Sequence, residues 1–295
     1  MNSYTYHEFF FPSFDDTKLY CREAGDKNKP LLLLIHGALT DSDFFKDTAE
    51  ILGQWFHVLS YDRRGHVRSE LLPGQKTEEV LARGPETPPL LSSSQILHTH
   101  VKDAIHLLLA FGNGNPSYII GHSLGGSIAL LLALTEPSLC KTVLVHEPLP
   151  DSAHTLDTER SRVLSAAKEL ADQGKTEKAV SSFSAILGEP DPRARSATPE
   201  EIQNILPDSK MFFFYDYPAF SSSAFVLPQG KGPLPLCFGA GERNQGRPAS
   251  AEITAMAKAY RAPVFFFPGG HNCGFDLPKE FAYLSAGILL GRKGF

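Results

Sequence analysis

One short stretch limits the possible folds of this chain more than any other. Residues 119–126 read Ile-Ile-Gly-His-Ser-Leu-Gly-Gly; an apolar run ends at Gly121, and a helix-forming run begins just after it. Gly121 and Gly125 lack Cβ atoms, so a strand and a helix can pass close together on either side of Ser123. We therefore expect Ser123 on a sharp strand-to-helix turn at the carboxyl edge of a sheet, beside a helix N-terminus that favours negative charge. This pattern predicts a catalytic serine.

Composition narrows the class of protein. The chain has 295 residues, of which 42% are hydrophobic and 21% are charged, so it can bury a core. Its net charge of -5, without a basic run, argues against nucleic acid or an anionic membrane as a partner. No apolar stretch reaches the roughly 18 residues that span a bilayer, and residues 1–8 do not resemble a signal peptide. We expect a cytoplasmic enzyme with a small-molecule substrate, and a homodimer is compatible with this composition.

The cysteines give no indication of a metal or a disulfide framework. They are widely spaced and form no C-x-x-C pair; they are Cys21, Cys140, Cys237 and Cys273. We expect buried thiols, with Cys273 near the rim of the site but not acting as a nucleophile. No cofactor and no metal is predicted.

Strand-like and helix-like segments alternate, which is typical of a parallel sheet covered by helices on both faces. Strands are expected near residues 4–11, 17–23, 31–36, 56–61, 117–121, 141–146, 234–239 and 263–267. Helices are expected near residues 43–53, 95–111, 124–135, 248–260 and 278–290. The turn-forming residues 12–16 predict that the first two strands are antiparallel.

Two stretches interrupt this alternation. Residues 70–94 predict a long surface loop near the mouth of the site, and 149–232 predict an inserted helical cap with helices near 159–173 and 176–187. The domain prediction is thus a core of 1–148 and 233–295 with a cap of 149–232. An aromatic cluster at 211–215 either packs the cap onto the core or lines an apolar substrate pocket.

A serine hydroxyl is a weak nucleophile without a base, so we looked for a histidine in a suitable loop. Of the 11 histidines, His271 directly follows the last strand-like run, where its ring could reach Ser123. His122 adjoins the nucleophile and should point away from the substrate. His98 and His100, two positions apart on a predicted helix, should diverge rather than bind a metal together.

Two glutamates are candidates for the acid that orients the histidine. Glu147 and Glu242 each follow a predicted strand, and both satisfy the chain order serine, acid, histidine. Glu242 is followed by Arg243 in a Gly-rich loop, a setting typical of a solvated side chain, whereas Glu147 leaves an apolar strand and precedes Pro148. This comparison favours Glu147 and leaves Glu242 as the alternative.

A tetrahedral oxyanion needs two backbone N–H donors. Leu124, directly after the serine, is one candidate. The second is Ala38, in the loop that ends the apolar run 31–35, where Gly37 lets the chain turn closely.

Taken together, these residues resemble the α/β-hydrolase fold family over nearly the whole chain: His36-Gly37, the segment 61–66, the serine turn and His271. The resemblance implies that segment 61–66 is a structural turn near the site. Val67 stands where the family usually has glycine, which puts the local backbone in doubt. A closer similarity, in His146-Glu147-Pro148, is to zearalenone-type lactone hydrolases, which take their catalytic glutamate from this position; this resemblance supports Glu147.

We therefore predict an α/β-hydrolase fold and hydrolysis of an ester or lactone of a small, largely apolar molecule through an acyl-enzyme. One alternative is hydrolysis of a carbon–carbon bond beside a ketone by the same triad. Another is a hydrolase-fold protein that only binds a small ligand. Haloalkane or epoxide chemistry is disfavoured because the nucleophile is serine rather than aspartate.

Overall fold

The computed structural model describes residues 6–81, 93–149, 159–188, 191–194, 196–222 and 234–292. Its central feature is a sheet of eight strands in the order β1-β2-β4-β3-β5-β6-β7-β8. The strands are β1 (His7–Pro12), β2 (Lys18–Ala24), β3 (Leu31–Ile35), β4 (His57–Tyr61), β5 (Ser117–His122), β6 (Cys140–His146), β7 (Leu236–Gly241) and β8 (Val264–Phe267). The described strands match the eight predicted ones with shifts of a few residues at their ends.

Strand β1 pairs with β2, and β2 with β4, in antiparallel register, and all the other pairings are parallel. Buried parallel strands are covered on both faces and are therefore apolar throughout. Alternate residues of β3 enter two different cores: Leu33 and Ile35 lie in one, Leu32 and Leu34 in the other. This alternation explains why 31–35 is a continuous run of leucine and isoleucine.

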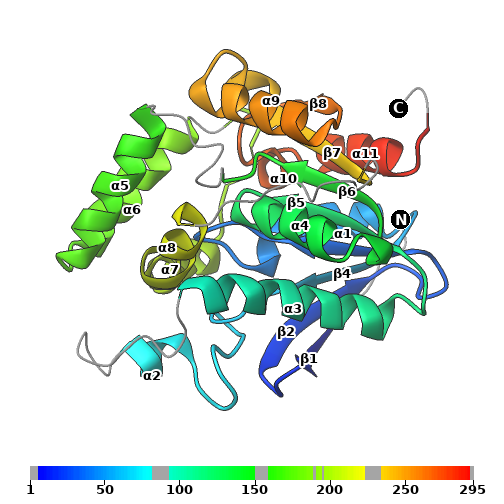
Figure 1. Cartoon of the computed structure of the whole chain (residues 1–295), viewed down its shortest axis with the longest axis horizontal. Helices are drawn as coiled ribbons and strands as arrows, with labels where there is room; N and C mark the ends of the chain where they lie inside the picture. The colour runs from blue at the N-terminus through cyan, green and yellow to red at the C-terminus, as the bar shows by residue number, and fades with distance from the viewer. Residues whose placement is uncertain are drawn as a thin grey trace.

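Helices on the two faces complete the layers (Figure 1). On one face, α4 (Leu124–Thr135) contacts β5 and β6, α3 (Ser93–Phe111) packs on α4, and α9 (Pro248–Tyr260) contacts β7. On the other face, α1 (Lys46–Leu52) packs on α11 (Pro278–Leu289), which contacts β6 and β8. The short elements η1 (Ser42–Phe45), η2 (Pro137–Leu139), η4 (Glu242–Asn244) and α10 (Cys273–Asp276) lie in the connections.

The connection from β6 to β7 carries a group of helices that we call the inserted helices. They are α5 (Glu159–Asp172), α6 (Thr176–Leu187), α7 (Pro199–Met211), the π-helix η3 (Phe212–Asp216) and α8 (Tyr217–Ser221). Helices α5 and α6 pair with each other, α6 contacts α7, and α8 contacts α3 of the core (Figure 1). The periodicity predicted α5 and α6. The run from α7 to α8 was expected only as a Pro-rich passage followed by an aromatic cluster.

The predicted surface loop at 70–94 is not wholly irregular. Residues Thr77–Leu81 form a short helix, α2, and Leu72 and Gln75 form an isolated bridge. Part of this stretch, 82–92, lies outside the described residues. Among the helices that are described, none is long and apolar enough to cross a membrane.

Candidate active site

The candidate site residues follow four parallel strands at one edge of the sheet. Gly37 and Ala38 come after β3, Ser123 after β5, Glu147 after β6 and His271 after β8. Because parallel strands end at the same edge, the fold brings together residues that are far apart in the chain.

The backbone at Ser123 has a conformation that L-residues rarely adopt. Its φ is 52° and its ψ is -122°, between the last residue of β5 and the first of α4. A Cβ on Gly121 would lie 2.2 Å from the Gly125 carbonyl oxygen, and one on Gly125 would lie 2.2 Å from the Ile35 carbonyl oxygen. Both positions thus need glycine. The Ser123 N–H donates to the His146 carbonyl at 2.9 Å, which ties the turn to β6.

His271 and Glu147 are in direct contact. The Nδ1 atom of His271 lies 2.8 Å from Oε2 of Glu147, and both side chains are buried. The Gly241 N–H donates to Oε1 of Glu147 at 2.7 Å, and the Asn244 amide donates to Oε1 at 2.8 Å and to Oε2 at 2.9 Å. Burial alone would raise the pKa of Glu147, but the hydrogen bond from His271, the nearby histidine charges and Asn244 lower it to about 2. The carboxylate is therefore ionised at neutral pH.

Glu242 lies elsewhere. Its side chain is exposed on η4. The following residue, Arg243, reaches Asp191 with a separation of 3.7 Å between Nη1 and Oδ2. Of the two candidate acids, only Glu147 has a hydrogen bond to His271 among the described contacts.

Ser123 and His271 line the same cavity, which we call the central cavity. Its volume is about 150 Å³, and its walls come from the loop after β3, the serine turn, the loop after β8 and two of the inserted helices. The lining includes Ala38, Thr40, His122, Phe183, Leu187, Ile205 and Asn272. A small organic molecule placed here would contact the serine and the histidine together.

A second, smaller space adjoins Ser123 and is lined only by apolar side chains apart from the serine itself. This apolar cavity has a volume of about 10 Å³ and is lined by Ala38, Ser123, Leu124, Leu149, Leu164, Phe183, Ile186, Leu187 and Phe212. The aromatic cluster at 211–215 therefore serves both predicted purposes: Phe213 is buried in the core, and Phe212 also faces the neighbourhood of the serine.

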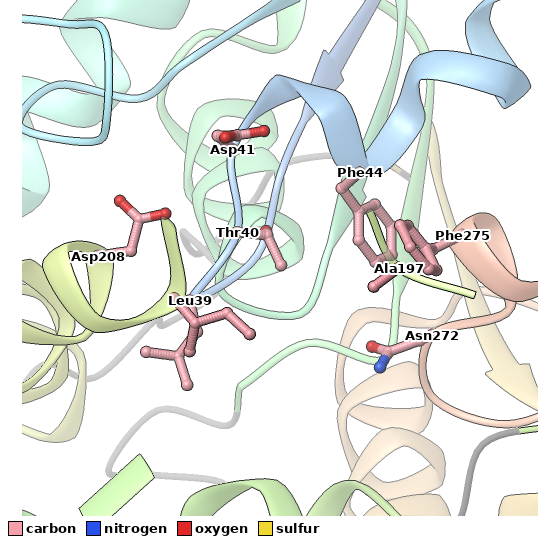
Figure 2. Close-up of a pocket in the computed structure, with 9 residues that line it drawn as sticks. Leu39, Thr40, Asp41, Phe44, Ala197, Asp208, Asn272 and Phe275 are labelled. Atoms are coloured by element: carbon pink, nitrogen blue, oxygen red, sulfur yellow. The ribbon is translucent and has the colours of Figure 1, made fainter. Parts of the chain in front are cut away.

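Leu39, Thr40, Ile205 and Asn272 are shared between the central cavity and a third, the outer cavity, of about 170 Å³. Figure 2 shows its walls: Leu39, Thr40 and Asp41 from the loop after β3, Phe44 from η1, Asp208 from α7, and Phe275 from α10. The outer cavity thus combines aromatic rings with carboxylates.

The loop after β3 passes directly over the nucleophile. A Cβ on Gly37 would lie 3.0 Å from the Cβ of Ser123, and Ala38 lines both the central and the apolar cavity beside Ser123. Leu124 is the first residue of α4, and the first N–H groups of a helix have no partner within the helix. The two predicted oxyanion donors thus come from segments that flank the serine.

Three buried residues pack behind the site. His122 stacks on Phe44 with ring centroids 4.5 Å apart and also lines the central cavity, so it does not point wholly away as predicted. Its Nδ1 lies 3.2 Å from Nδ1 of His146, whose Nε2 lies 3.3 Å from the Cys273 sulfur. Burial, together with the charge of Glu147, raises the pKa of the Cys273 thiol well above its usual value, which is unfavourable for a nucleophile.

His98 and His100 diverge as predicted: His98 is exposed on α3 and His100 is buried. Within the described ranges, no group of three or more His, Cys, Asp or Glu side chains could hold a metal ion. All four cysteines are free and buried.

Some residues of the site gave no sequence signal. Asn244 holds the Glu147 carboxylate, yet it lies in a loop where an asparagine is unremarkable. Arg63 and Asp216 form a fully buried ion pair with 2.9 Å between Nη1 and Oδ2, at a sequence separation of 153 residues. Val67, which departs from the usual glycine, adopts a positive φ of 31°, so the valine keeps a backbone conformation that disfavours β-branched residues.

The chain belongs to the alpha/beta hydrolase family, because the sequence model of that family matches residues 32–282. Among curated proteins it is similar to the uncharacterized hydrolase YraK of Bacillus subtilis, with 35% identity over 123 residues, 41% of this chain and 38% of that protein. It is also similar to human monoglyceride lipase, with 27% identity over 157 residues, 51% of this chain and 47% of the lipase. The matched region spans less than half the length of either relative.

Solved structures share the fold. A membrane phospholipase A described as a bacterial virulence factor superposes with a TM-score of 0.68 at 19% identity, covering 97% of this chain and 86% of that one. The carboxylesterase CesB of Bacillus subtilis gives 0.66 at 14% identity, with coverage of 99% and 93%. The enol-lactonase of Burkholderia xenovorans gives 0.61 at 19% identity, with coverage of 96% and 100%.

Proposed function

We propose that this protein is a serine hydrolase that cleaves a carboxylic ester through an acyl-enzyme formed on Ser123, with His271 as the base and Glu147 as the acid. The observation that supports this most directly is the 2.8 Å contact between His271 Nδ1 and Glu147, with Ser123 and His271 on one cavity. A carboxylate at Nδ1 fixes the proton there and leaves Nε2 as the acceptor for the serine proton.

The reaction then proceeds in two halves. Ser123 Oγ attacks the ester carbonyl while His271 takes its proton, and the N–H groups of Ala38 and Leu124 hold the oxyanion. Collapse of this intermediate expels the alcohol, which receives the proton from His271. Water, activated by the same histidine, attacks the acyl-enzyme and releases the acid and the free serine.

The cavities support an orientation for the substrate. The leaving alcohol must lie where His271 can protonate it, and His271 lines the central cavity but not the apolar one. The alcohol part therefore occupies the central cavity and extends into the outer cavity, and the acyl part points into the apolar cavity. A volume of about 10 Å³ is comparable to the space that one water molecule needs, so only a very short acyl chain fits.

The test has two stages. A fluorophosphonate probe should label wild-type protein at Ser123, as mapped by mass spectrometry of the labelled peptide, and should not label Ser123→Ala. A series of p-nitrophenyl esters should then show higher kcat/KM for acetyl than for hexanoyl or longer chains. Absence of labelling at Ser123 would overturn the acyl-enzyme; a preference for long chains would overturn only the orientation.

The acyl orientation can be tested with a matched pair of variants on α5. Leu164 lines the apolar cavity, whereas Leu170 packs against the core without lining it. Leu164→Ala should move the chain-length preference towards butyryl and hexanoyl esters. Leu170→Ala also loses buried apolar contacts but should leave that preference unchanged.

Lactone hydrolysis is the second candidate. Glu147 follows β6, as the catalytic glutamate does in the zearalenone-type lactone hydrolases, and a cap formed by 149–232 would enclose such a ring. Macrolactones and β-diketones tested beside the esters separate the three bond types. Turnover of a macrolactone with no turnover of acetyl esters would favour this candidate.

A further inference from the structure

The carbonyl group of Gly37 is held from two directions. Nη2 of Arg63 donates to it at 3.0 Å, and Nδ1 of His36 lies 3.0 Å from the same oxygen. The tautomer of His36 follows from a third contact: the Arg63 backbone N–H donates to its Nε2 at 2.9 Å, so that nitrogen carries the lone pair and the proton is on Nδ1. Burial, helped by the charge of Arg63, lowers the pKa of His36 well below its usual value, so the ring is neutral.

Fixing this carbonyl also fixes the N–H of the next residue. A trans peptide is planar, and its C=O and N–H groups point in opposite directions. With the Gly37 oxygen directed at Arg63, the Ala38 N–H is directed to the other side of the peptide. Ala38 borders Ser123 in two cavities, and Gly37 itself lies against the serine Cβ. A guanidinium on the carbonyl also polarises the peptide, which strengthens its N–H as a donor.

Arg63 is in turn held by the inserted helices. Asp216, on the π-helix η3, accepts from Nη1 of Arg63 at 2.9 Å, and both side chains have no exposed surface. The same carboxylate contacts Nε2 of His100 at 2.8 Å and Nε2 of His66 at 3.2 Å. Without Asp216, the Arg63 charge would be unpaired in the protein interior, which is strongly unfavourable.

We propose that Arg63 is a positioning residue that aims the Ala38 N–H at the oxyanion, and that Asp216 makes this arrangement depend on the inserted helices being packed on the core. The inference rests on the proposed acyl-enzyme mechanism. Under it, the oxyanion site is complete only when the β6–β7 insertion is docked, so binding geometry and catalytic competence are linked through one buried ion pair.

The test compares Arg63→Met with Arg64→Met in the full chain. Arg64 is an equally buried arginine on the same turn, paired with Asp103 and Asp15 through separations of 2.7 and 2.9 Å, and it does not contact Gly37. Trifluoroacetophenone is the probe. Ser123 Oγ adds to its carbonyl carbon, the serine proton passes to His271, and the former carbonyl oxygen becomes an oxyanion. Acetophenone has the same ring but is not activated for this addition.

The readout is the ratio of the two inhibition constants, together with kcat and KM for p-nitrophenyl acetate. Arg63→Met should reduce kcat by about 10²–10³-fold, as loss of one oxyanion donor does. It should weaken trifluoroacetophenone by a similar factor while leaving acetophenone and KM within about threefold. Arg64→Met should lose stability only. Asp216→Asn, which keeps its shape, should reduce kcat in the same way, and Arg63→Met combined with Asp216→Asn should be little worse than either single variant.

Should Arg63→Met fail to fold, Asp216→Asn carries the same comparison, and sub-denaturing guanidinium added to Arg63→Ala should restore activity. The proposal is overturned if a folded Arg63→Met, or Asp216→Asn in its place, keeps the wild-type ratio of inhibition constants. That result differs from failure of the proposed function, because fluorophosphonate labelling of Ser123 in the wild-type protein would persist. If Ser123 is not labelled, the mechanism itself is wrong.

Discussion

Asn244 donates to both oxygens of the Glu147 carboxylate, at 2.8 and 2.9 Å, while His271 contacts one of them at 2.8 Å. The amide and the imidazole reach the carboxylate from the loops after β7 and β8, and Glu147 itself follows β6. Three neighbouring strand ends therefore fix the orientation of the histidine ring. An acid held in this way costs little reorganisation when the imidazole becomes charged, which is the requirement for a general base that works beside a serine.

Replacing the nucleophile should abolish turnover without unfolding the protein. In Ser123→Ala, hydrolysis of p-nitrophenyl acetate should fall to the background rate because the hydroxyl supplies chemistry rather than packing. His271→Ala should be about as severe, and the double variant little worse, since the two residues act as a unit. Circular dichroism should show unchanged secondary structure. Wild-type hydrolysis by a folded, purified Ser123→Ala would exclude the triad.

The two candidate acids give opposite forecasts. Glu147→Gln should lower kcat by about 10²–10⁴-fold, because the amide keeps the shape but cannot stabilise the imidazolium. Glu242→Gln should change kcat less than about twofold, because its side chain is exposed. Steady-state kinetics of the two variants, prepared side by side, decide the matter. The reverse ranking would transfer the role to Glu242.

The glycine at the start of α4 should be essential for stability. A Cβ on Gly125 would meet backbone oxygens of Ile35 at 2.2 Å and His36 at 2.4 Å, and backbone cannot move aside as a flexible side chain can. Gly125→Ala should therefore reduce the free energy of unfolding by about 3 kcal/mol or more. Gly270→Ala is the matched control, since nothing lies within 4 Å of its added Cβ. Equal urea midpoints for the two variants would contradict this account.

The buried histidines should make the fold sensitive to mild acid. Burial lowers the pKa of His146 from 6.5 to about 4. The stability that this neutral ring provides is complete above pH 6.5 and is lost as the pH falls towards 4, because the unfolded chain takes up a proton that the folded chain refuses. Each such group contributes up to about 1.4 kcal/mol per pH unit in this window. His36, His100 and His122, whose pKa values burial also lowers, act in the same direction.

Chemical denaturation at pH 7 and pH 5 measures this effect. His146→Gln should reduce the pH dependence of the unfolding free energy by about 1.4 kcal/mol per pH unit, whatever the other groups contribute, because it removes one titrating ring. A slope identical to that of the wild-type protein would show that His146 takes up its proton in the folded state.

The thiols should be unreactive in the native protein. Burial raises the pKa of Cys140 and Cys237 to about 12 and raises the pKa values of Cys21 and Cys273 further above their usual range. Ellman's reagent should therefore react slowly with the folded chain and fully in denaturant. Cys273→Ser should keep activity within a few-fold. Loss as complete as in Ser123→Ala would identify Cys273 as a participant in the reaction.

Much of the fold could be predicted because it follows from local pattern. The apolar runs of β3 and β5 are too short for helices and lie between turn signals, and the period of α3 and α4 is helical. The serine turn was predictable for the same reason: Gly121 and Gly125 are both needed where strand and helix cross. Chain order alone allowed either Glu147 or Glu242, and the apolar strand before Glu147 favoured the one that contacts His271.

The parts that escaped prediction depend on contacts between distant segments. Nothing near Arg63 indicates that its guanidinium meets Asp216, 153 residues later, or that it reaches back to the Gly37 carbonyl. Asn244 is equally silent, because its role depends on where β6 and β7 end relative to each other. The helix α7 contains Pro207 and runs into three phenylalanines, so its pattern lacks a clear amphipathic period.

The π-helix at Phe212–Asp216 has a consequence for how this chain tolerates changes in length. A π-helical segment carries one residue more than an α-helical turn of the same rise, so it sets the angular phase of everything that follows it. Removing one residue there, for instance the exposed Phe214, would return the segment to regular α-helix and turn Asp216 by about 100° around the helix axis. The carboxylate would then face away from Arg63, although every side chain of the pair would still be present. The number of residues in this one turn therefore matters as much to the buried pair as the identity of either partner.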